Sequence, residues 1–257
     1  SVTYGGAVYD NANAGTASKI TVSGISLTAI TGSNSSALTD YALSATSKDV
    51  SASISKTSLT ITANKDGKFV GTSDPTFTGS YAGYVNGEAV GVLGGTLSIS
   101  RSNAGVNTAG NFAGVLVASG HSSGNYNISY AAGNFTIVPS DQLLVTVANV
   151  TNIYGTATQY AVTDVEYFDG VVYSLSDGSV AGSSVANNGA NVITVADGAG
   201  GTATFTLAAL SAVTSTADKL AVGAYQLGTS GTVTEDSAKF SSTITVVGSH
   251  TVNVKGL

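Results

Sequence analysis

Apolar and polar residues alternate along much of this chain with a period of two residues. The alternation is plain in the runs 20–22, 50–54 and 59–61, and clusters of Gly, Ser and Asn bound each run. Side chains two positions apart in an extended chain point to the same face, so each run predicts a β-strand with one buried face. We therefore expect an all-β fold with at most short helical turns, for which 86–90 and 216–220 are the candidates.

Two stretches of the chain carry the same pattern 84 residues apart (155 − 71). The first consists of Leu59, Ile61, Thr62, Phe69, Val70, Gly71 and Thr72, and the second of Leu143, Val145, Thr146, Ile153, Tyr154, Gly155 and Thr156. Self-similarity at a fixed spacing predicts that the chain is built from copies of one folding unit.

The repeat divides the chain into three predicted β modules. Residues 1–57 form a truncated module, residues 58–140 a complete one with a turn at 66–67, and residues 141–257 a divergent copy with longer loops. Pro139 cannot donate to a strand ladder, so 139–141 is predicted to be a linker. The expected architecture is an elongated array of tandem small β-sandwich or β-grasp-like modules.

The amino-acid composition argues against several classes of binding partner. Only 9% of residues are charged, the net charge is −6, and the nine basic residues are scattered, which argues against nucleic-acid binding. There is no cysteine for a disulfide or a thiolate metal site. No run approaches the roughly 18 apolar residues of a spanning helix, so we expect no membrane insertion. The opening at Ser1 shows no signal-peptide pattern, and we expect the chain to be a piece of a longer protein.

Residues 58–63, 80–88, 92–95 and 124–128 closely follow a known repeat pattern. They resemble the MBG module, a glycine-rich unit that occurs in tandem in very large secreted bacterial surface proteins, including filamentous-haemagglutinin-like adhesins. The runs 14–24 and 40–43 resemble its frequent neighbour, the YDG module. The resemblance implies a stalk or adhesive segment of a surface-exposed or exported protein, and it offers no catalytic residues.

The two histidines give little support for catalysis. His121 and His250 each lie in a Ser/Gly context, and neither has a carboxylate beside it in the sequence. We interpret both as exposed turn residues and expect the chain not to be an enzyme.

Acidic residues gather in the divergent module. Asp164, Glu166, Asp169 and Asp177 lie within 14 residues of one another, and oxygen ligands of this kind can hold Ca²⁺. The spacing matches neither an EF-hand nor a glycine-aspartate β-roll repeat, so solvated loop acids are the default interpretation. Calcium is the only cofactor for which the sequence offers candidate ligands.

Tyrosines suggest an alternative function. Tyr84, Tyr126, Tyr167 and Tyr225 occupy repeat-equivalent positions and are predicted to be core residues, whereas Tyr9, Tyr130, Tyr160 and Tyr173 are freer. The repeat pattern breaks at about 164–206, where a specialised function is first expected. Tyr160 and Tyr173, beside and within this stretch, are the candidate ligand-binding residues of a glycan-binding β module.

The sequence thus predicts a structural or adhesive stalk segment of a large bacterial adhesin, secreted or at the cell surface. Its expected partners are adjacent modules of the same chain and glycans or proteins of a host cell, a neighbouring cell or a matrix. A glycan-binding β module is the alternative.

Overall fold

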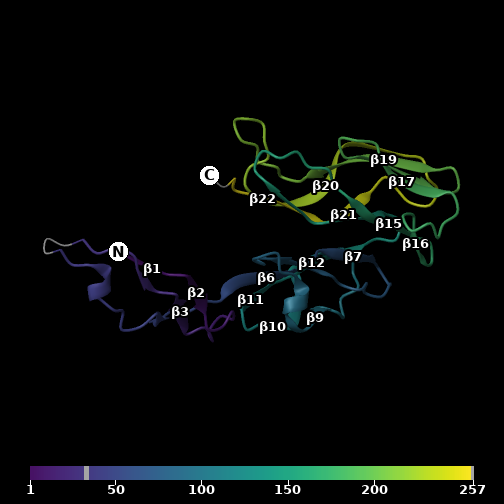
Figure 1. Ribbon diagram of the computed structural model, residues 1–257. Coiled ribbons are helices and arrows are strands. Elements are labelled where there is room, and N and C mark those ends of the chain that lie inside the picture. The colour runs from purple at the N-terminus through teal and green to yellow at the C-terminus, as the bar shows by residue number, and fades with distance from the viewer. Residues whose placement is uncertain (32–34, 256–257) are drawn as a thin grey trace. The chain divides into compact units, whose positions relative to one another are not determined.

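The fold was analysed in a computed structural model that describes residues 1–31 and 35–255. Within these residues the regular structure consists of β-strands and two short 3-10 helices, which confirms the all-β prediction (Figure 1). The N-terminal segment contains β1 (Val2–Thr3), β2 (Gly6–Tyr9), β3 (Lys19–Ser23), β4 (Ser26–Leu27), η1 (Leu38–Asp40) and β5 (Ser47–Ser51).

The first complete copy of the repeat follows. It contains β6 (Thr57–Ala63), β7 (Asp66–Phe69), β8 (Gly79–Ala82), η2 (Val90–Val92), β9 (Gly94–Arg101), β10 (Gly110–Ser122), β11 (Tyr126–Ala131) and β12 (Gly133–Val138). Its strands form two sheets, in the orders β7-β12-β10-β9 and β11-β6-β8.

The second copy begins after Pro139. It contains β13 (Leu143–Val147), β14 (Val150–Ile153), β15 (Val162–Phe168), β16 (Val172–Ser174), β17 (Ser183–Asn187), β18 (Val192–Asp197), β19 (Thr202–Ala209), β20 (Gly223–Glu235), β21 (Ile244–Val247) and β22 (Ser249–Asn253). Its sheets have the orders β16-β15-β13-β21 and β14-β22-β20-β19-β18-β17.

The chain divides into two compact units. Unit 1 holds residues 1–60, 81–96 and 120–129, and unit 2 holds residues 61–80, 97–119 and 130–255 of the described chain. These limits differ from the module limits predicted at 57 and 140, which stay predictions.

Unit 1 buries few apolar side chains. Its N-terminal part forms a three-stranded antiparallel sheet, β2-β3-β5, and a two-stranded one, β1-β4. Large apolar residues on these strands or beside them stay exposed: Val2, Tyr4, Val8 and Val50. The run 20–22 lies in β3 as predicted, whereas the run 50–54 only overlaps the end of β5. The buried face predicted for these strands was wrong, because strands of two to five residues without a second layer cannot cover one.

Unit 2 contains the main core. Leu143, Val145 and Val165 from one sheet of the second copy pack against Ile193 and Phe205 from the other, so this copy is a two-sheet sandwich. A second cluster fills the part of the first copy that lies in unit 2, around Leu116 and Phe135.

Two elements of the sequence repeat recur in the structure at the same spacing. Strands β7 and β14 start at Asp66 and Val150, again 84 residues apart (150 − 66). Each is followed by a glycine in the left-handed region, Gly71 at φ +83° and Gly155 at φ +90°, which a residue with a Cβ rarely adopts.

Three local predictions need correction. Residues 66–67 lie in strand β7 and not in a turn, since Gly67 lets β7 approach the carbonyl oxygen of Thr136 on β12. The stretches 86–90 and 216–220 contain turns and not helices, because Asn86 and Asp218 both have positive φ. The nearest 3-10 helix, η2, starts only at Val90.

Close backbone packing at Gly133 gives a stability test. A Cβ added to Gly133 would lie 2.4 Å from the carbonyl oxygen of Ala63, so Gly133→Ala is expected to cost about 1–3 kcal/mol in urea unfolding. Gly105 is the matched control, because a Cβ there meets nothing within 4 Å and its backbone is not left-handed. Equal unfolding free energies for Gly133→Ala and Gly105→Ala would contradict the packing.

Candidate functional site

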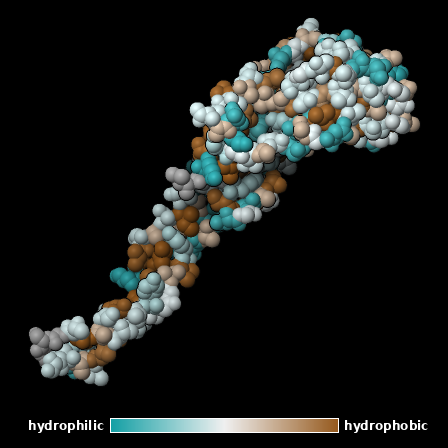
Figure 2. Space-filling view, turned by 90° about the horizontal axis from the view of Figure 1, so that it is seen from above, coloured by the Kyte–Doolittle hydropathy of each residue, from teal (hydrophilic) through white to brown (hydrophobic). Residues whose placement is uncertain are grey.

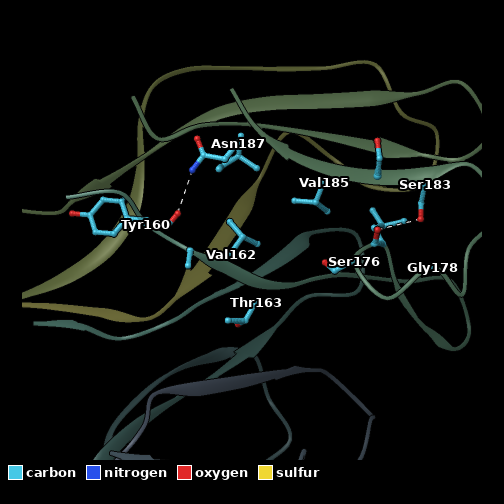
Figure 3. Close-up of a pocket in the computed structure, with 12 residues that line it drawn as sticks. Tyr160, Val162, Thr163, Ser176, Gly178, Ser183, Val185 and Asn187 are labelled. Atoms are coloured by element: carbon cyan, nitrogen blue, oxygen red, sulfur yellow. Dashed lines mark hydrogen bonds between the residues drawn. The ribbon is translucent and has the colours of Figure 1, made fainter. Parts of the chain in front are cut away.

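A cavity opens in the second copy where β15 and β17 face each other (Figure 3). Its volume is about 510 Å³, and β17 is the edge strand of its sheet. Hydroxyl, amide and apolar groups line it together, among them Tyr160, Val162, Thr163, Ser176, Val185 and Asn187. We call this the β15–β17 cavity. Its mixed lining is of the kind that ligand pockets have, with apolar walls and a few polar groups.

Tyr160 lies at this cavity but is not the free ring that the sequence predicted, because only 6% of it is exposed. Its hydroxyl lies 3.0 Å from Nδ1 of His250, and the two rings meet edge to face at 5.6 Å. Its backbone N–H donates to Oδ1 of Asn191 at 2.8 Å, and its carbonyl accepts from Nδ2 of Asn187 at 3.3 Å. Tyr160 is therefore held as a wall of the cavity.

Tyr173 lies elsewhere, on β16. It is 37% exposed and stacks on Tyr167 with ring centroids 5.0 Å apart. It is not among the residues that line the β15–β17 cavity, so the structure does not bring Tyr160 and Tyr173 together as one platform.

His250 was interpreted as an exposed turn residue, and that was wrong. It is 2% exposed, on β22, with Nε2 3.4 Å from the hydroxyl of Thr158. Burial lowers its pKa below the usual histidine value. His121 likewise lies on a strand, β10, with Nε2 2.9 Å from the hydroxyl of Tyr81.

The four acids considered for calcium have separate surroundings. Asp164 accepts from the Ser174 hydroxyl at 2.6 Å, Asp169 pairs with Lys239 at 3.4 Å on the surface, and Asp177 accepts the N–H of Ser179 at 2.8 Å. In the described ranges no group of three or more His, Cys, Asp or Glu side chains could hold a metal ion. The geometry therefore lends no support to calcium at these residues.

The fourth acid, Glu166, lines a different cavity, formed by β7 and the loop after it together with β15 and residues 170–172. We call it the junction cavity, and its volume is about 530 Å³. Phe69 stacks on Phe168 in its wall, with ring centroids 6.0 Å apart. Phe69 also packs with Val138, Leu144 and Val247, so the core here is continuous from the first copy to the second.

Two buried cations stand beside the junction cavity. Arg101 makes a bidentate ion pair with Asp74, at 2.8 and 2.9 Å, and Lys68 reaches the same carboxylate at 2.9 Å. The Arg101 hydrogen bonds hold the pKa of Asp74 below its usual value. The Arg101 guanidinium also lies 4.9 Å from the ring centroid of Phe135. One carboxylate thus pairs with two cations that are only 6% and 5% exposed as residues.

Two acids at the junction have pKa values that are raised, in contrast to that of Asp74. Burial raises the pKa of Glu166 to about 7, and the neighbouring charges of Asp164, Asp66 and Asp177 add to the shift. Burial likewise raises the pKa of Asp66 to about 6.

Residues 59–136 match the family model of the MBG domain, YGX type. This confirms the resemblance to MBG-type repeat modules. No curated protein and no solved structure matches the chain. Among the residues described, no helix has the length and apolar character needed to cross a membrane.

We call residues 59–136 the MBG segment. Its Arg101, Asp74 and Lys68 were missed as a buried network, because the partners are 27 and 6 residues apart in the sequence and nothing local links them. The one available signal was composition, since Arg101 is the only arginine in the chain. Asn187 and Asn191, which hold the backbone of Tyr160, were hidden among many asparagines in loops.

The ion network of the MBG segment predicts a large effect for one conservative substitution. Asp74→Asn leaves Lys68 and Arg101 buried without a counter-charge, and should lower the unfolding free energy by about 2–3 kcal/mol in urea titrations. Asp169→Asn is the control, because the Asp169 side chain is 61% exposed and its loss should cost less than about 0.5 kcal/mol. Comparable losses for the two variants would show that the buried network is not stabilising.

The raised carboxyl pKa values predict that ionisation at the junction destabilises the fold. The neutral forms of Asp66 and Glu166 stabilise the folded state fully below the pKa values of the unfolded chain, about 4. This contribution is lost as pH rises through about 6 and about 7. His250 acts oppositely, because its lowered pKa makes the fold lose stability as pH falls below about 6.5.

Glu166→Gln isolates the carboxyl contribution, because His250 is the same in both proteins and the amide does not ionise. Between about pH 5 and about pH 8, the carboxyl contribution should make the unfolding free energy of the unmodified protein fall relative to that of Glu166→Gln. Parallel pH profiles for the two proteins would rule out a raised pKa at Glu166.

Proposed function

We propose that the chain is a structural and adhesive stalk segment of a large bacterial adhesin, secreted or held at the cell surface, that mediates attachment to a cell surface or matrix. The match of residues 59–136 to the MBG domain supports this assignment at the level of an adhesin-like repeat module. Adjacent modules of the same chain are its structural partners.

The continuous core between the two copies carries the proposal. Phe69 and Val138 of the first copy share one buried cluster with Leu144 and Val247 of the second. A polar contact adds to it, since Nδ2 of Asn149 donates to Oδ1 of Asn64 at 2.7 Å. Repeat units that bury apolar surface against their neighbours stabilise one another and resist bending at the joint, which a stalk requires.

The surface chemistry fits the same role. Figure 2 shows hydrophobic residues singly or in small groups among hydrophilic ones on the displayed face. With 9% charged residues and a net charge of −6, such a surface favours weak contacts over strong charge attraction. We also propose that the chain is not an enzyme. The side-chain partners of the buried His250 include the Tyr160 and Thr158 hydroxyls, which supports a packing role for it.

The β15–β17 cavity favours a second candidate, a glycan-binding module. Thr163, Ser176 and Asn187 offer hydroxyl and amide groups beside the apolar Val162 and Val185, a combination that can bind sugar hydroxyls and ring faces. The Asn187 amide is partly engaged by Tyr160, so this candidate ranks second.

An attachment assay tests the leading proposal. Bacterial cells that display the full chain on an inert carrier should attach to collagen-coated wells or to an epithelial monolayer several-fold more than cells with the carrier alone. No increase on either surface would contradict the adhesive role.

A glycan array probed with the purified chain separates the alternative. Val185→Trp should abolish array hits by filling the β15–β17 cavity, while Val50→Trp, at a 49% exposed position outside the cavity, should leave them. An array without hits would rule out the glycan-binding function. The attachment assay would then decide whether the chain has the adhesive stalk function.

A further inference from the structure

The two opening strands of the second copy, β13 and β14, pair with its two closing strands, β21 and β22, and each pair runs in the same direction. Strand β13 pairs in parallel with β21, from Leu143 opposite Ile244 to Thr146 opposite Val247. Strand β14 continues this with β22, from Val150 opposite His250 to Ile153 opposite Asn253. Two further backbone bonds lengthen the ladder: Leu143 N–H to Thr243 O at 3.2 Å and Tyr154 N–H to Asn253 O at 2.9 Å.

The first copy is closed in the same way. Strand β7 pairs in parallel with β12, from Asp66 opposite Phe135 to Phe69 opposite Val138. The ladder is again lengthened by one bond, from Val70 N–H to Val138 O at 2.9 Å. This bond and the Tyr154 bond occupy equivalent positions 84 residues apart (154 − 70), so the parallel closure belongs to the repeat.

Direction decides how such a ladder carries force. In a parallel pair the bonds are evenly spaced along both strands. When the start of the first strand and the end of the last strand are pulled apart, the two strands are drawn past each other and all bonds between them share the load. When the strands are pulled apart from the same end, the bonds break one after another and each carries the load alone.

We propose that the parallel closing strands form a mechanical clamp in each copy, which makes the chain resist force applied along its length. Within the second copy, a pull through the chain enters at Leu143 and leaves at Asn253, which are the two ends that load the ladder in shear. The clamp rests on the proposed stalk function for its use, because an attached cell transmits drag through every module between ligand and anchor.

The surroundings of the ladder strengthen it. Leu143, Val145 and Val147 on β13 are at most 3% exposed, so little water reaches the bonds of this strand. The crossing between β21 and β22 is tight, since a Cβ on Gly248 would lie 2.8 Å from the Val147 carbonyl oxygen. The Thr245 hydroxyl also donates to Oε1 of Gln142 at 2.9 Å across the start of the ladder.

Optical-trap pulling in two directions tests the clamp on the full chain. The chain has no cysteine, so pairs of introduced cysteines are unique attachment points for handles. Asp141→Cys with Lys255→Cys loads the ladder of the second copy in shear. Asp141→Cys with Ser242→Cys peels the ladder from one end. Asp141 and Ser241 lie together at the start of β13 and β21, where the Ser241 N–H donates a hydrogen bond to the Asp141 carbonyl oxygen at 2.7 Å. All three substituted side chains are exposed.

The shear pair should unfold at about three to four times the force of the peeling pair at the same loading rate, because four registered residue pairs of β13 and β21 share the load. The shear pair spans 114 residues (255 − 141) and the peeling pair 101 (242 − 141). At 3.3–3.6 Å per residue their extended lengths are roughly 380–410 Å and roughly 330–360 Å, and an event of this size identifies the second copy. Equal melting temperatures of the two cysteine variants show that only the direction of force differs.

Equal forces in the two directions, or a higher force in peeling, would overturn the clamp. If one cysteine pair lowers the melting temperature, Ser140→Cys and Val254→Cys replace Asp141→Cys and Lys255→Cys in the same design, both at exposed positions. The measurement contains no ligand, so it can fail while the attachment assay succeeds. A high shear force without attachment would leave the clamp standing and remove the adhesive role.

Discussion

The parallel pairing of opening strands with closing strands is the constraint on which the rest of each copy depends. It brings Leu143 and Ile244, 101 residues apart (244 − 143), into register, and everything between them must form a closed structure. Non-local pairing of this kind costs loop-closure entropy, which buried apolar contacts must offset. The second copy supplies them through the two-sheet core around Val145, Val165 and Phe205.

The same strands also build the joint between copies. Strand β12 ends at Val138 and β13 starts at Leu143, so the closing strand of one copy leads directly into the opening strand of the next. Val138 and Leu144 share a cluster with Phe69, and the buried Arg101, Asp74 and Lys68 network stands beside it. Strand β13 therefore serves both, because Leu143 and Val145 belong to the core of the second copy and Leu144 belongs to the cluster shared with the first copy.

The sequence predicts the local part of this structure well. Alternation at 59–61 locates β6 correctly, and the 84-residue repeat marks two segments that the structure also shows as equivalent, each with a left-handed glycine after its strand. Contacts over long separations leave no local signal. Tyr160 and His250 are 90 residues apart in the sequence but in contact in the fold, and both are buried. Neither burial could be inferred from the residues on either side of each in the sequence.

In the N-terminal segment the error runs the other way, because residues that the pattern predicts to be buried are exposed. Val50 lies in a run that alternates as buried strand residues do, yet it is 49% exposed, and Val8 on β2 is 69% exposed. No second layer lies over β2-β3-β5 in the described structure. Asp66 illustrates a similar limit, since an Asp-Gly pair is typical of turns and only the partner strand β12 makes it part of a sheet.

The central claim is that each copy is closed by its parallel ladder. Native-state hydrogen exchange tests it most directly. The amides of Val70, Leu143 and Tyr154 should exchange only through global unfolding of unit 2, with the same large protection as the core amides of β19. Protection at these three amides as low as that in residues 1–31 would contradict the account, because the ladder would then open without unfolding the copy that it closes.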